Sequence, residues 1–207
     1  MLTMAIPTGR SMEDAAELLT KADILPPGTD PGRRLDIPLG ELRIILVKPQ
    51  DVPPLVHMGF AQLGLAGQDV ILESGARVAV LHDTGLCPCR MVIAGPPKAR
   101  EGLMNSPNRK LRVATKYVRT ADQVLPQRGL RTVTVPLHGS VEIAPALGIA
   151  EVIMDIVQTG NTLKANGLSV LMELFPVTMR LIANPGALNL QWDRIRPMLE
   201  RIREVSG

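Results

Sequence analysis

Aromatic side chains are scarce in this chain, making up 2% of its 207 residues. Proteins that hold single-stranded nucleic acid usually stack its bases on aromatic side chains, so this scarcity argues against such a ligand. The 23 lysines and arginines are scattered rather than gathered into runs, and the formal net charge is only +3. We therefore expect neither nucleic acid nor a membrane as a partner, whereas a small ligand rich in phosphate suits this balance.

Long apolar runs are also missing, since none approaches the roughly 18 residues that a membrane-spanning helix needs. Residues 1–7 do not lead into the basic region, long apolar stretch and cleavage site that together mark an export signal. These absences predict a soluble protein of the cytoplasm. They also argue against a solute-binding module of a transporter.

Patterns typical of metal ligands are weak. Cys87 and Cys89 are the only cysteines, and a single CxC without a second ligand pair is a poor metal signal. His57, His82 and His138 have no mutual spacing typical of a metal site. We expect buried or half-buried thiols, histidines at the surface or in the core, and no metal site built from protein side chains.

Apolar sequence is abundant, because hydrophobic residues make up 45% of the chain and can bury a sizeable core. Short apolar runs typical of strands alternate with amphipathic segments, and this alternation favours an α/β fold. The expected strands are residues 42–47, 78–81, 91–94, 111–114, 132–135 and 152–157.

Three segments carry helix signals. Ser11 can cap a helix over residues 12–19, and Pro53 can open a helix over residues 53–60, because a proline at a first helical position loses no hydrogen bond. The third is an amphipathic helix near the end, whose residues at helical spacing are Trp192, Ile195, Leu199 and Ile202.

Residues 151–163 form the most informative stretch, an apolar strand that runs into a turn and then a helix beginning near Thr162. The N–H groups at such a helix start, together with the helix dipole, favour an anion such as phosphate. Gly160 permits a backbone conformation that a side chain would block, and the hydroxyls of Thr159 and Thr162 can bond phosphate oxygens. The stretch predicts a phosphate-binding loop.

Two carboxylates precede this turn. Glu151 and Asp155 are four residues apart, so on a strand they share a face, and Asp155 lies close to the turn. Carboxylates beside a phosphate loop need hydroxyls or a metal to bind, and a ribose supplies two hydroxyls. An ordinary capped turn with solvated acids is the alternative, but the acids and the apolar strand together favour a site for a phosphorylated sugar.

A series of motifs accompanies this loop along the chain. In order, they are residues 5–10 (AIPTGR), 51–53 (DVP), 64–70 (GLAGQDV) with Glu73, 112–117 (RVATKY), 139–145 (GSVEIAP), 147–150 (LGIA) and 159–168 (TGNTLKANGL). In these residues the sequence closely resembles the ATP phosphoribosyltransferases of histidine biosynthesis. The resemblance implies a glycosyltransferase that moves the phosphoribosyl group of phosphoribosyl pyrophosphate to a ring nitrogen of ATP, the first step of that pathway.

The resemblance also implies a fold. We expect two α/β lobes like those of type II periplasmic binding proteins, each a mixed sheet flanked by helices, with the active site in the cleft. Breaks around residues 96–110 and at Asn184–Gly186 agree with two lobes. Residues 1–92 and 182–207 are expected to form the first lobe, and residues 93–181 the second, which carries the phosphate loop.

The length implies the short form of the family, without a C-terminal regulatory domain. Short-form members pair with a separate subunit that resembles histidyl-tRNA synthetase, so we expect a homodimer that this regulatory subunit joins into a hetero-octamer. Magnesium is the implied cofactor, bound mainly through the pyrophosphate of the substrate. Catalysis would then rest on positioning and electrostatics, without a covalent intermediate.

The resemblance assigns the site residues individually. As catalytic residues, Arg10 is expected to clamp pyrophosphate or triphosphate, Glu142 to contact a nucleotide or sugar hydroxyl, and Asp155 to face the ribose hydroxyls. The expected substrate-binding residues are Lys48, Asp69, Glu151, Thr159, Gly160, Asn161, Thr162 and Leu163. Without the resemblance, Arg10 and Lys48 would be ordinary surface charges, and Asp69 a helix cap or a solvated acid.

Some positions depart from the family pattern, which commonly has lysine where Thr8 and Gln68 stand and aspartate where Glu151 stands. The two missing positive charges can weaken binding of polyanions, unless the partner subunit compensates. They leave open a catalytically silent, nucleotide-binding regulatory paralogue. The presence of Glu142, Asp155 and the complete phosphate loop argues against this alternative.

Overall fold

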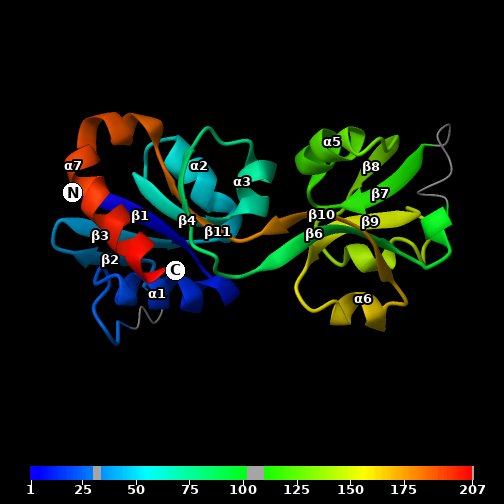
Figure 1. Ribbon diagram of the computed structural model, residues 1–207, viewed down its shortest axis with the longest axis horizontal. Helices are drawn as coiled ribbons and strands as arrows, with labels where there is room; N and C mark the ends of the chain where they lie inside the picture. The colour runs from blue at the N-terminus through cyan, green and yellow to red at the C-terminus, as the bar shows by residue number, and fades with distance from the viewer. Residues whose placement is uncertain (30–33, 102–109, 207) are drawn as a thin grey trace. The chain divides into compact units, whose positions relative to one another are not determined.

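The chain forms two compact units in the computed structural model (Figure 1). The described residues are 1–29, 34–101 and 110–206. The first unit consists of Met1–Pro88 and Thr178–Gly207, and the second of Cys89–Val177. The chain therefore passes between the units twice.

Both boundaries fall four residues before the expected positions after residues 92 and 181. Strand β6 (Cys89–Gly95) pairs along its length with strands of the second unit, so its first residues belong there. Strand β11 (Met179–Ala183) pairs instead with strands of the first unit. Strand pairing, rather than the breaks around residues 96–110 and at Asn184–Gly186, sets the boundaries.

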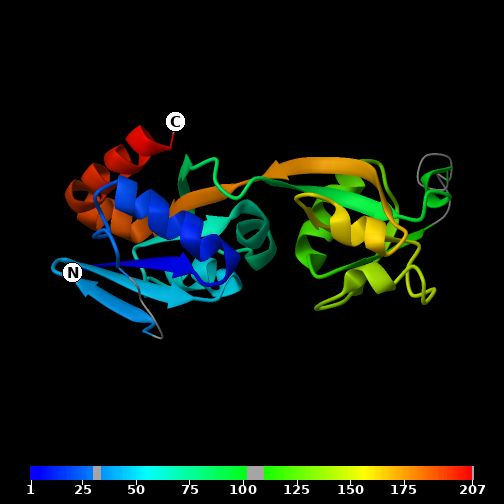
Figure 2. The ribbon, with the colours of Figure 1, turned by 90° about the horizontal axis from the view of Figure 1, so that it is seen from below.

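The first unit is built on a six-stranded sheet of order β2-β3-β1-β4-β11-β5 (Figure 2). Its other strands are β1 (Leu2–Pro7), β2 (Asp36–Leu39), β3 (Leu42–Val47), β4 (Leu63–Gly67) and β5 (Ala79–Asp83). Neighbours β3, β1 and β4 run parallel, whereas β2, β11 and β5 pair antiparallel. The carboxyl ends of the three parallel strands therefore lie along one edge.

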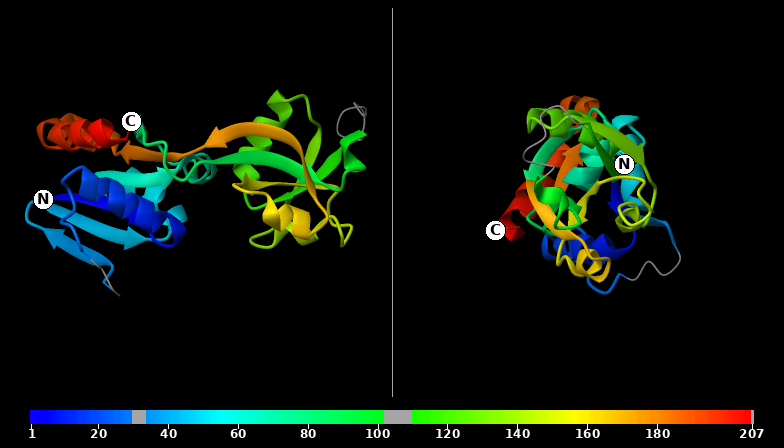
Figure 3. Two further views of the ribbon diagram at one scale, coloured as in Figure 1. Left: turned by 60° about the horizontal axis from the view of Figure 1, so that its bottom comes forward. Right: turned by 90° about the vertical axis from the view of Figure 1, so that its right-hand side faces the viewer.

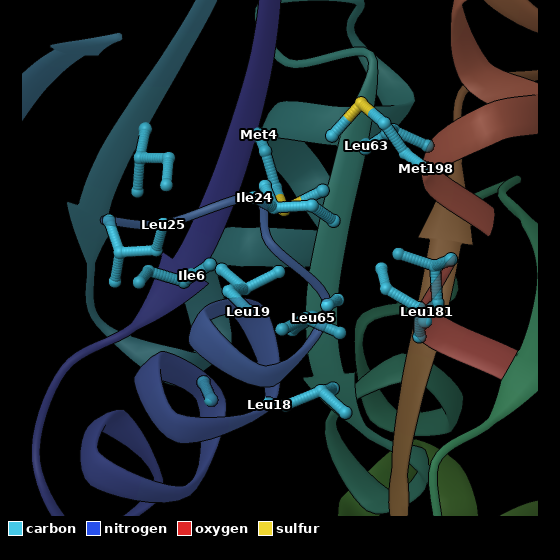
Figure 4. Close-up of a cluster of buried hydrophobic side chains, with 14 of the residues drawn as sticks. Met4, Ile6, Leu18, Leu19, Ile24, Leu25, Leu63, Leu65, Leu181 and Met198 are labelled. Carbon is cyan, nitrogen blue, oxygen red and sulfur yellow. The ribbon is translucent and has the colours of Figure 1, made fainter. Parts of the chain in front are cut away.

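Helices cover both faces of this sheet. They are α1 (Arg10–Lys21), the short 3₁₀ helix η1 (Pro49–Asp51), α2 (Val52–His57), α3 (Gln68–Ser74) and α7 (Pro185–Val205). Strand side chains alternate, so Met4 packs with Leu19 of α1 and Met198 of α7 in the larger core (Figure 4), while Ala5 packs with Val56 of α2 on the other face. Burying each large apolar side chain contributes about 1.5–3 kcal/mol.

The second unit is built on a five-stranded sheet of order β10-β6-β9-β7-β8. Its other strands are β7 (Leu111–Thr115), β8 (Thr132–Pro136), β9 (Val152–Val157) and β10 (Ser169–Val177), of which β9, β7 and β8 are parallel neighbours. Helix α5 (Val118–Gln127) covers one face, and α6 (Asn161–Ala165) with the 3₁₀ helix η2 (Val141–Ile143) covers the other (Figure 3).

The strands at residues 42–47 and 152–157 have the expected bounds, but the bounds of two helices were wrong, and α1 also ends at Lys21 rather than at residue 19. Helix α1 begins at Arg10, with Gly9 and not Ser11 at the N-cap position. Gly9 has a φ of 82°, so the turn before the helix uses a conformation that glycine adopts easily. Helix α2 ends at His57 rather than at residue 60, shortly before Gly59, whose φ is also positive.

The C-terminal helix differs from the expectation at its start. Asn184, expected as part of a break between elements, is the N-cap residue of α7. Its side-chain oxygen accepts a hydrogen bond from the Ala187 N–H at 3.0 Å. The helix is kinked at Gln191. Trp192, which the amphipathic pattern had assigned to the packed face of the helix, is 42% exposed. The other three residues of the pattern are buried: Ile195, Leu199 and Ile202.

Cys87 and Cys89 are half-buried and unlinked, as expected, and the Cys87 thiol donates to Asp14 at 2.9 Å. The polar stretch 105–109, expected as part of a break, lies outside the described residues. In the parts that the structure describes, no helix has the length and apolar character needed to cross a membrane.

Candidate active site

The carboxyl ends of β9, β7 and β8 bring several expected site residues to one edge of the second sheet. These strands are neighbours and run parallel, so the segments that leave them lie side by side. The segments are the phosphate loop after β9, Lys116 after β7, and residues 137–142 after β8. Open α/β sheets bind ligands at this edge.

The phosphate loop has the backbone that the sequence indicated. Gly160 occupies the N-cap position of α6 with a φ of 78°. Thr159 and Thr162 are exposed, whereas Leu163 is buried in the core beneath η2 and α6. Because the first N–H groups of a helix have no acceptor within it, the loop presents donors to an anion while Leu163 anchors it.

Asp155 lies on the same face of the sheet as α6. Ile153 and Val157, two residues before and after it, belong to the core beneath η2 and α6, so Asp155 faces that side. Its side chain is 20% exposed, and its Oδ1 lies 3.8 Å from Lys116 Nζ and accepts a bond from the Ile156 N–H at 2.8 Å. The carboxylate is therefore held in place near the loop.

Glu142 reaches this face through η2. Ser140 turns the chain with a φ of 47°, and the neighbours of Glu142 that anchor η2, Val141 and Ala144, are buried in the core that also receives Leu163. Glu142 itself is half-buried. The shared core brings Glu142, Asp155 and the phosphate loop to one face of the sheet.

Glu151 lies elsewhere, at the amino end of β9, whereas the phosphate loop follows the carboxyl end. Its carboxylate accepts a bond from the Arg112 N–H at 2.8 Å and one from the Arg112 guanidinium at 3.0 Å. The bond from the Arg112 side chain, against the opposing effect of burial, holds the pKa of Glu151 below its usual value. Glu151 thus joins β9 to β7, and its geometry gives no support to a role in binding substrate.

The first unit repeats the same arrangement with β3, β1 and β4. The carboxyl ends of these parallel strands lead to Lys48, to Gly9 and Arg10, and to the turn Gly67–Asp69, respectively. Three of the expected residues of this unit, Arg10, Lys48 and Asp69, therefore lie along one edge of its sheet.

Arg10 and Lys48 are exposed cations on neighbouring segments. The Thr8 N–H donates to the Val47 carbonyl at 2.8 Å, which ties the two segments together just beyond their strands. No atom lies within 4 Å of the position that a Cβ would take at Gly9, so the start of α1 is open. Such an open helix start beside two cations suits a phosphate group.

Asp69 is buried, being only 6% exposed, which excludes the solvated acid considered above. A Cβ on Gly67 would stand 2.3 Å from Asp69 Oδ1, so a side chain at position 67 would displace the carboxylate. Gln68 is bonded twice: its N–H donates to the Thr178 carbonyl at 3.0 Å, and its Oε1 accepts from Arg180 at 2.8 Å. The turn is therefore packed and held by β11.

Sequence reasoning missed two arginines that the fold brings to these edges. Arg180 lies near the start of β11, opposite Ala66 of β4, and Arg90 lies near the start of β6, opposite Val157 of β9. Arg90 pairs with Glu173. Both arginines arrive on antiparallel strands that are distant in sequence from the motifs, so no local pattern pointed to them.

Comparisons with known proteins agree with this geometry. The family model for HisG, ATP phosphoribosyltransferase, matches residues 48–204. Two curated proteins named ATP phosphoribosyltransferase, from Symbiobacterium thermophilum and Geobacillus kaustophilus, are 40% and 42% identical over 99% of this chain and over 94% and 98% of theirs. The chain belongs to the ATP phosphoribosyltransferase family.

Solved structures support the family and the fold. In the ATP phosphoribosyl transferase (HisG:HisZ) complex from Thermotoga maritima, one chain is 30% identical with a TM-score of 0.83, covering 100% of this chain and 98% of that one. The periplasmic VFT2 domain of Bordetella pertussis BvgS is 16% identical with a TM-score of 0.61, covering 100% and 88%, and shows the fold alone. The expected class, two lobes like a type II periplasmic binding protein, is confirmed.

As a member of the ATP phosphoribosyltransferase family, the chain is a phosphoribosyl transferase of the first step of histidine biosynthesis. The arrangement suits this chemistry, because each sheet edge combines an open helix start with charged side chains. Oriented N–H groups and cations stabilise phosphate groups, and half-buried acids can bind hydroxyls.

We expect Glu151→Gln to destabilise the protein at pH 7 but not in acid. Because the pKa of Glu151 is lowered by folding, its contribution is present above the unfolded pKa and is lost as the pH falls through the folded pKa. The cost at pH 7 should be below about 2 kcal/mol, since the pair is partly exposed. Urea unfolding at several pH values would measure it.

Glu173→Gln is a matched control, because it breaks a pair with Arg90 in which both side chains are more than 40% exposed. This control should cost less than Glu151→Gln at pH 7. A cost of Glu151→Gln that stays constant from neutral to acid pH would contradict the role given to the Arg112 pair.

Proposed function

We propose that the carboxyl edge of the second sheet binds phosphoribosyl pyrophosphate. The observation that carries this proposal is the presence of Asp155 and the phosphate loop on the same face, at the carboxyl end of one strand. The N–H groups of residues 159–163 would hold the sugar phosphate, and Asp155 would accept bonds from the ribose hydroxyls. Glu142 would contact a nucleotide or sugar hydroxyl.

In the first unit, Arg10 and Lys48 would bind the polyphosphate parts of the substrates. Both cations are exposed, and Arg10 opens α1 where the helix dipole adds to its charge. The planar guanidinium of Arg10 can bond two phosphate oxygens at once. Asp69, fixed against Gly67, would serve as a placed acceptor in the same edge.

In the reaction, a ring nitrogen of adenine donates its electron pair to the anomeric carbon of the ribose, and the bond from that carbon to the pyrophosphate oxygen breaks. The electron pair of the broken bond leaves with pyrophosphate, so no protein nucleophile is needed. The chain's residues would hold both reactants in line and stabilise the departing anion. We propose that Arg10 bonds phosphate oxygens, and that Asp155 faces the sugar, whose positive charge grows.

A divalent metal, magnesium in our proposal, would neutralise charge on the pyrophosphate. Magnesium usually keeps several waters and binds through one or two carboxylates together with substrate phosphates. Across the described residues, no three side chains of the His, Cys, Asp or Glu types come together as a metal site. In our proposal the metal arrives with the substrate, bound mainly through its pyrophosphate.

We further propose that the chain works as a short-form member with a separate regulatory subunit. The Thermotoga maritima relative was solved as a HisG:HisZ complex, and this chain matches 98% of that relative's length. In this proposal the chain forms a homodimer, and a synthetase-like subunit joins homodimers into a hetero-octamer. Regulation by histidine would then lie mainly in the partner.

Formation of the product tests the proposed activity directly. The full chain, with ATP, phosphoribosyl pyrophosphate and magnesium, should form phosphoribosyl-ATP, followed by its absorbance, and should do so faster when its candidate synthetase-like partner is added. Turnover in either mixture supports the proposed function. If both substrates bind but neither mixture gives product, the silent regulatory paralogue becomes the better description.

Replacing Asp155 by alanine should lower turnover at least about tenfold, because a charged acceptor for the ribose hydroxyls is worth roughly 1.5–3 kcal/mol. The matched control is Asp122→Ala in α5, which removes another acid of the same unit, bonded to Thr134, on the opposite face of the sheet. Steady-state rates should fall for the first variant only. Equal rates in both variants would remove Asp155 from the site.

Gly160→Val should abolish binding of the sugar phosphate, because a valine at a φ of 78° distorts the loop. Gly167→Val is the control, since Gly167 follows the same helix with a φ of 69° and open space around it. Both variants should lose about 1–2 kcal/mol of stability, but calorimetric titration with phosphoribosyl pyrophosphate should show loss of binding only for Gly160→Val. Comparable binding in the two variants would argue against the loop as the phosphate site.

A further inference from the structure

Arg180 belongs to a bonded cluster beside the turn that carries Asp69. Because β11 runs antiparallel to β4, Arg180 stands opposite Ala66, at the edge where β4 ends. One guanidinium nitrogen donates to Gln68 Oε1 at 2.8 Å, and another lies 2.5 Å from Asp83 Oδ2. The guanidinium therefore bridges the start of α3 and the end of β5.

The Arg180 side chain is more buried than the arginines of several other ion pairs. The Arg180 side chain is 21% exposed and that of Asp83 is 46% exposed, whereas the arginines paired with Asp36, Glu173, Glu151, Glu41 and Glu200 are 38–61% exposed. Charges that are less exposed are also less screened, so the partial burial of the guanidinium strengthens its bonds to Gln68 and Asp83. The planar guanidinium of arginine has several N–H donors, so it can bond Gln68 and Asp83 at the same time.

The acid that holds Arg180 is itself fixed. Thr178 Oγ1 donates to Asp83 at 2.6 Å, and the Gly85 N–H donates to it at 3.1 Å. Although burial opposes the effect, these bonds and the charge of Arg180 hold the pKa of Asp83 below its usual value. Asp83 is therefore an ionised and rigid support for the guanidinium.

Gln68 is fixed by a second bond, to the residue just before β11. Its N–H donates to the Thr178 carbonyl at 3.0 Å, just where the chain enters the first unit for the second time. Hydrogen bonds thus fix both the backbone and the side chain of Gln68, and Asp69 is the next residue in the chain. Since Asp69 is buried against Gly67, its position depends on how firmly Gln68 is held.

We propose that Arg180 is a positioning residue of the active site, acting through Gln68 on the turn that carries Asp69. Gln68 stands where the family commonly has a lysine, and the structure gives it a partner that lies on a different strand. The cluster holds the turn in one conformation before substrate binds, which lowers the cost of binding. This inference rests on the proposed function, because that proposal assigns Asp69 to the substrates.

The test uses the full chain with its synthetase-like partner and measures kcat and KM for both substrates. Arg180→Met should raise KM for one substrate about tenfold while kcat changes less than about threefold, as expected when binding is lost uniformly. Arg180→Lys keeps the charge but not the fork, so it should recover part of the loss. Gln68→Met should reproduce Arg180→Met, and the double variant should be no worse than either single one.

Two further variants separate positioning from simple stabilisation. Arg43→Met breaks a similar pair with Asp36, 2.6 Å long, at the amino end of the parallel strand β3, and should lower Tm without changing KM. Gln68→Glu keeps the acceptor for Arg180, so it should preserve Tm, yet its negative charge should raise KM for the phosphorylated substrate. An Arg180→Met protein with lower Tm and unchanged KM, or additive effects in the double variant, would overturn the proposal.

Failure of the proposed function gives a different result. If the wild-type chain with its partner forms no product, the function is refuted, and calorimetric titration of the same variants with ATP and phosphoribosyl pyrophosphate tests Arg180 separately. A loss of affinity in Arg180→Met and Gln68→Met, but not in Arg43→Met, supports the positioning role. Equal affinities in all three would refute it.

Discussion

Parallel pairing of neighbouring strands is the constraint on which the arrangement of this protein depends. In each sheet three adjacent strands run parallel, so their carboxyl ends meet at one edge and the segments that follow them are neighbours. Residues as far apart as Arg10 and Asp69, or Glu142 and Thr159, are gathered in this way. Helices on both faces bury the sheets and keep the edges rigid.

Several charges at these edges are held by partners, whereas Arg10 and Lys48 are exposed. Lys116 lies beside Asp155, and Asp83 supports Arg180, which in turn holds Gln68. Fixed charges and oriented N–H groups stabilise polyanions without rearranging during the reaction, which is the main source of catalysis expected for phosphoribosyl transfer. The same partial burial would make an unpaired charge costly, so the pairs serve stability as well as binding.

Local signals account for what was predicted well. The phosphate loop and the strand before it could be recognised because an apolar run, a glycine and a helix start follow one another within a few residues. Helix ends were predicted less well. The residue at the N-cap position of α1 is Gly9, which has a positive φ, whereas Ser11, a residue type common at N-caps, lies inside the helix. Glu151 shares its strand with Asp155 but lies at the other end, where Arg112 binds it.

The sequence alone determined the family, the α/β class and the conformation of the turn at Gly160, since each depends on contiguous residues and mainly on their neighbours. Only the tertiary structure decided which charges are paired. Arg112 with Glu151, and Arg180 with Gln68 and Asp83, meet through strand register across separations of 39 to 112 residues. A side chain's partner across a sheet depends on strand order, direction and register, and long-range packing sets all three.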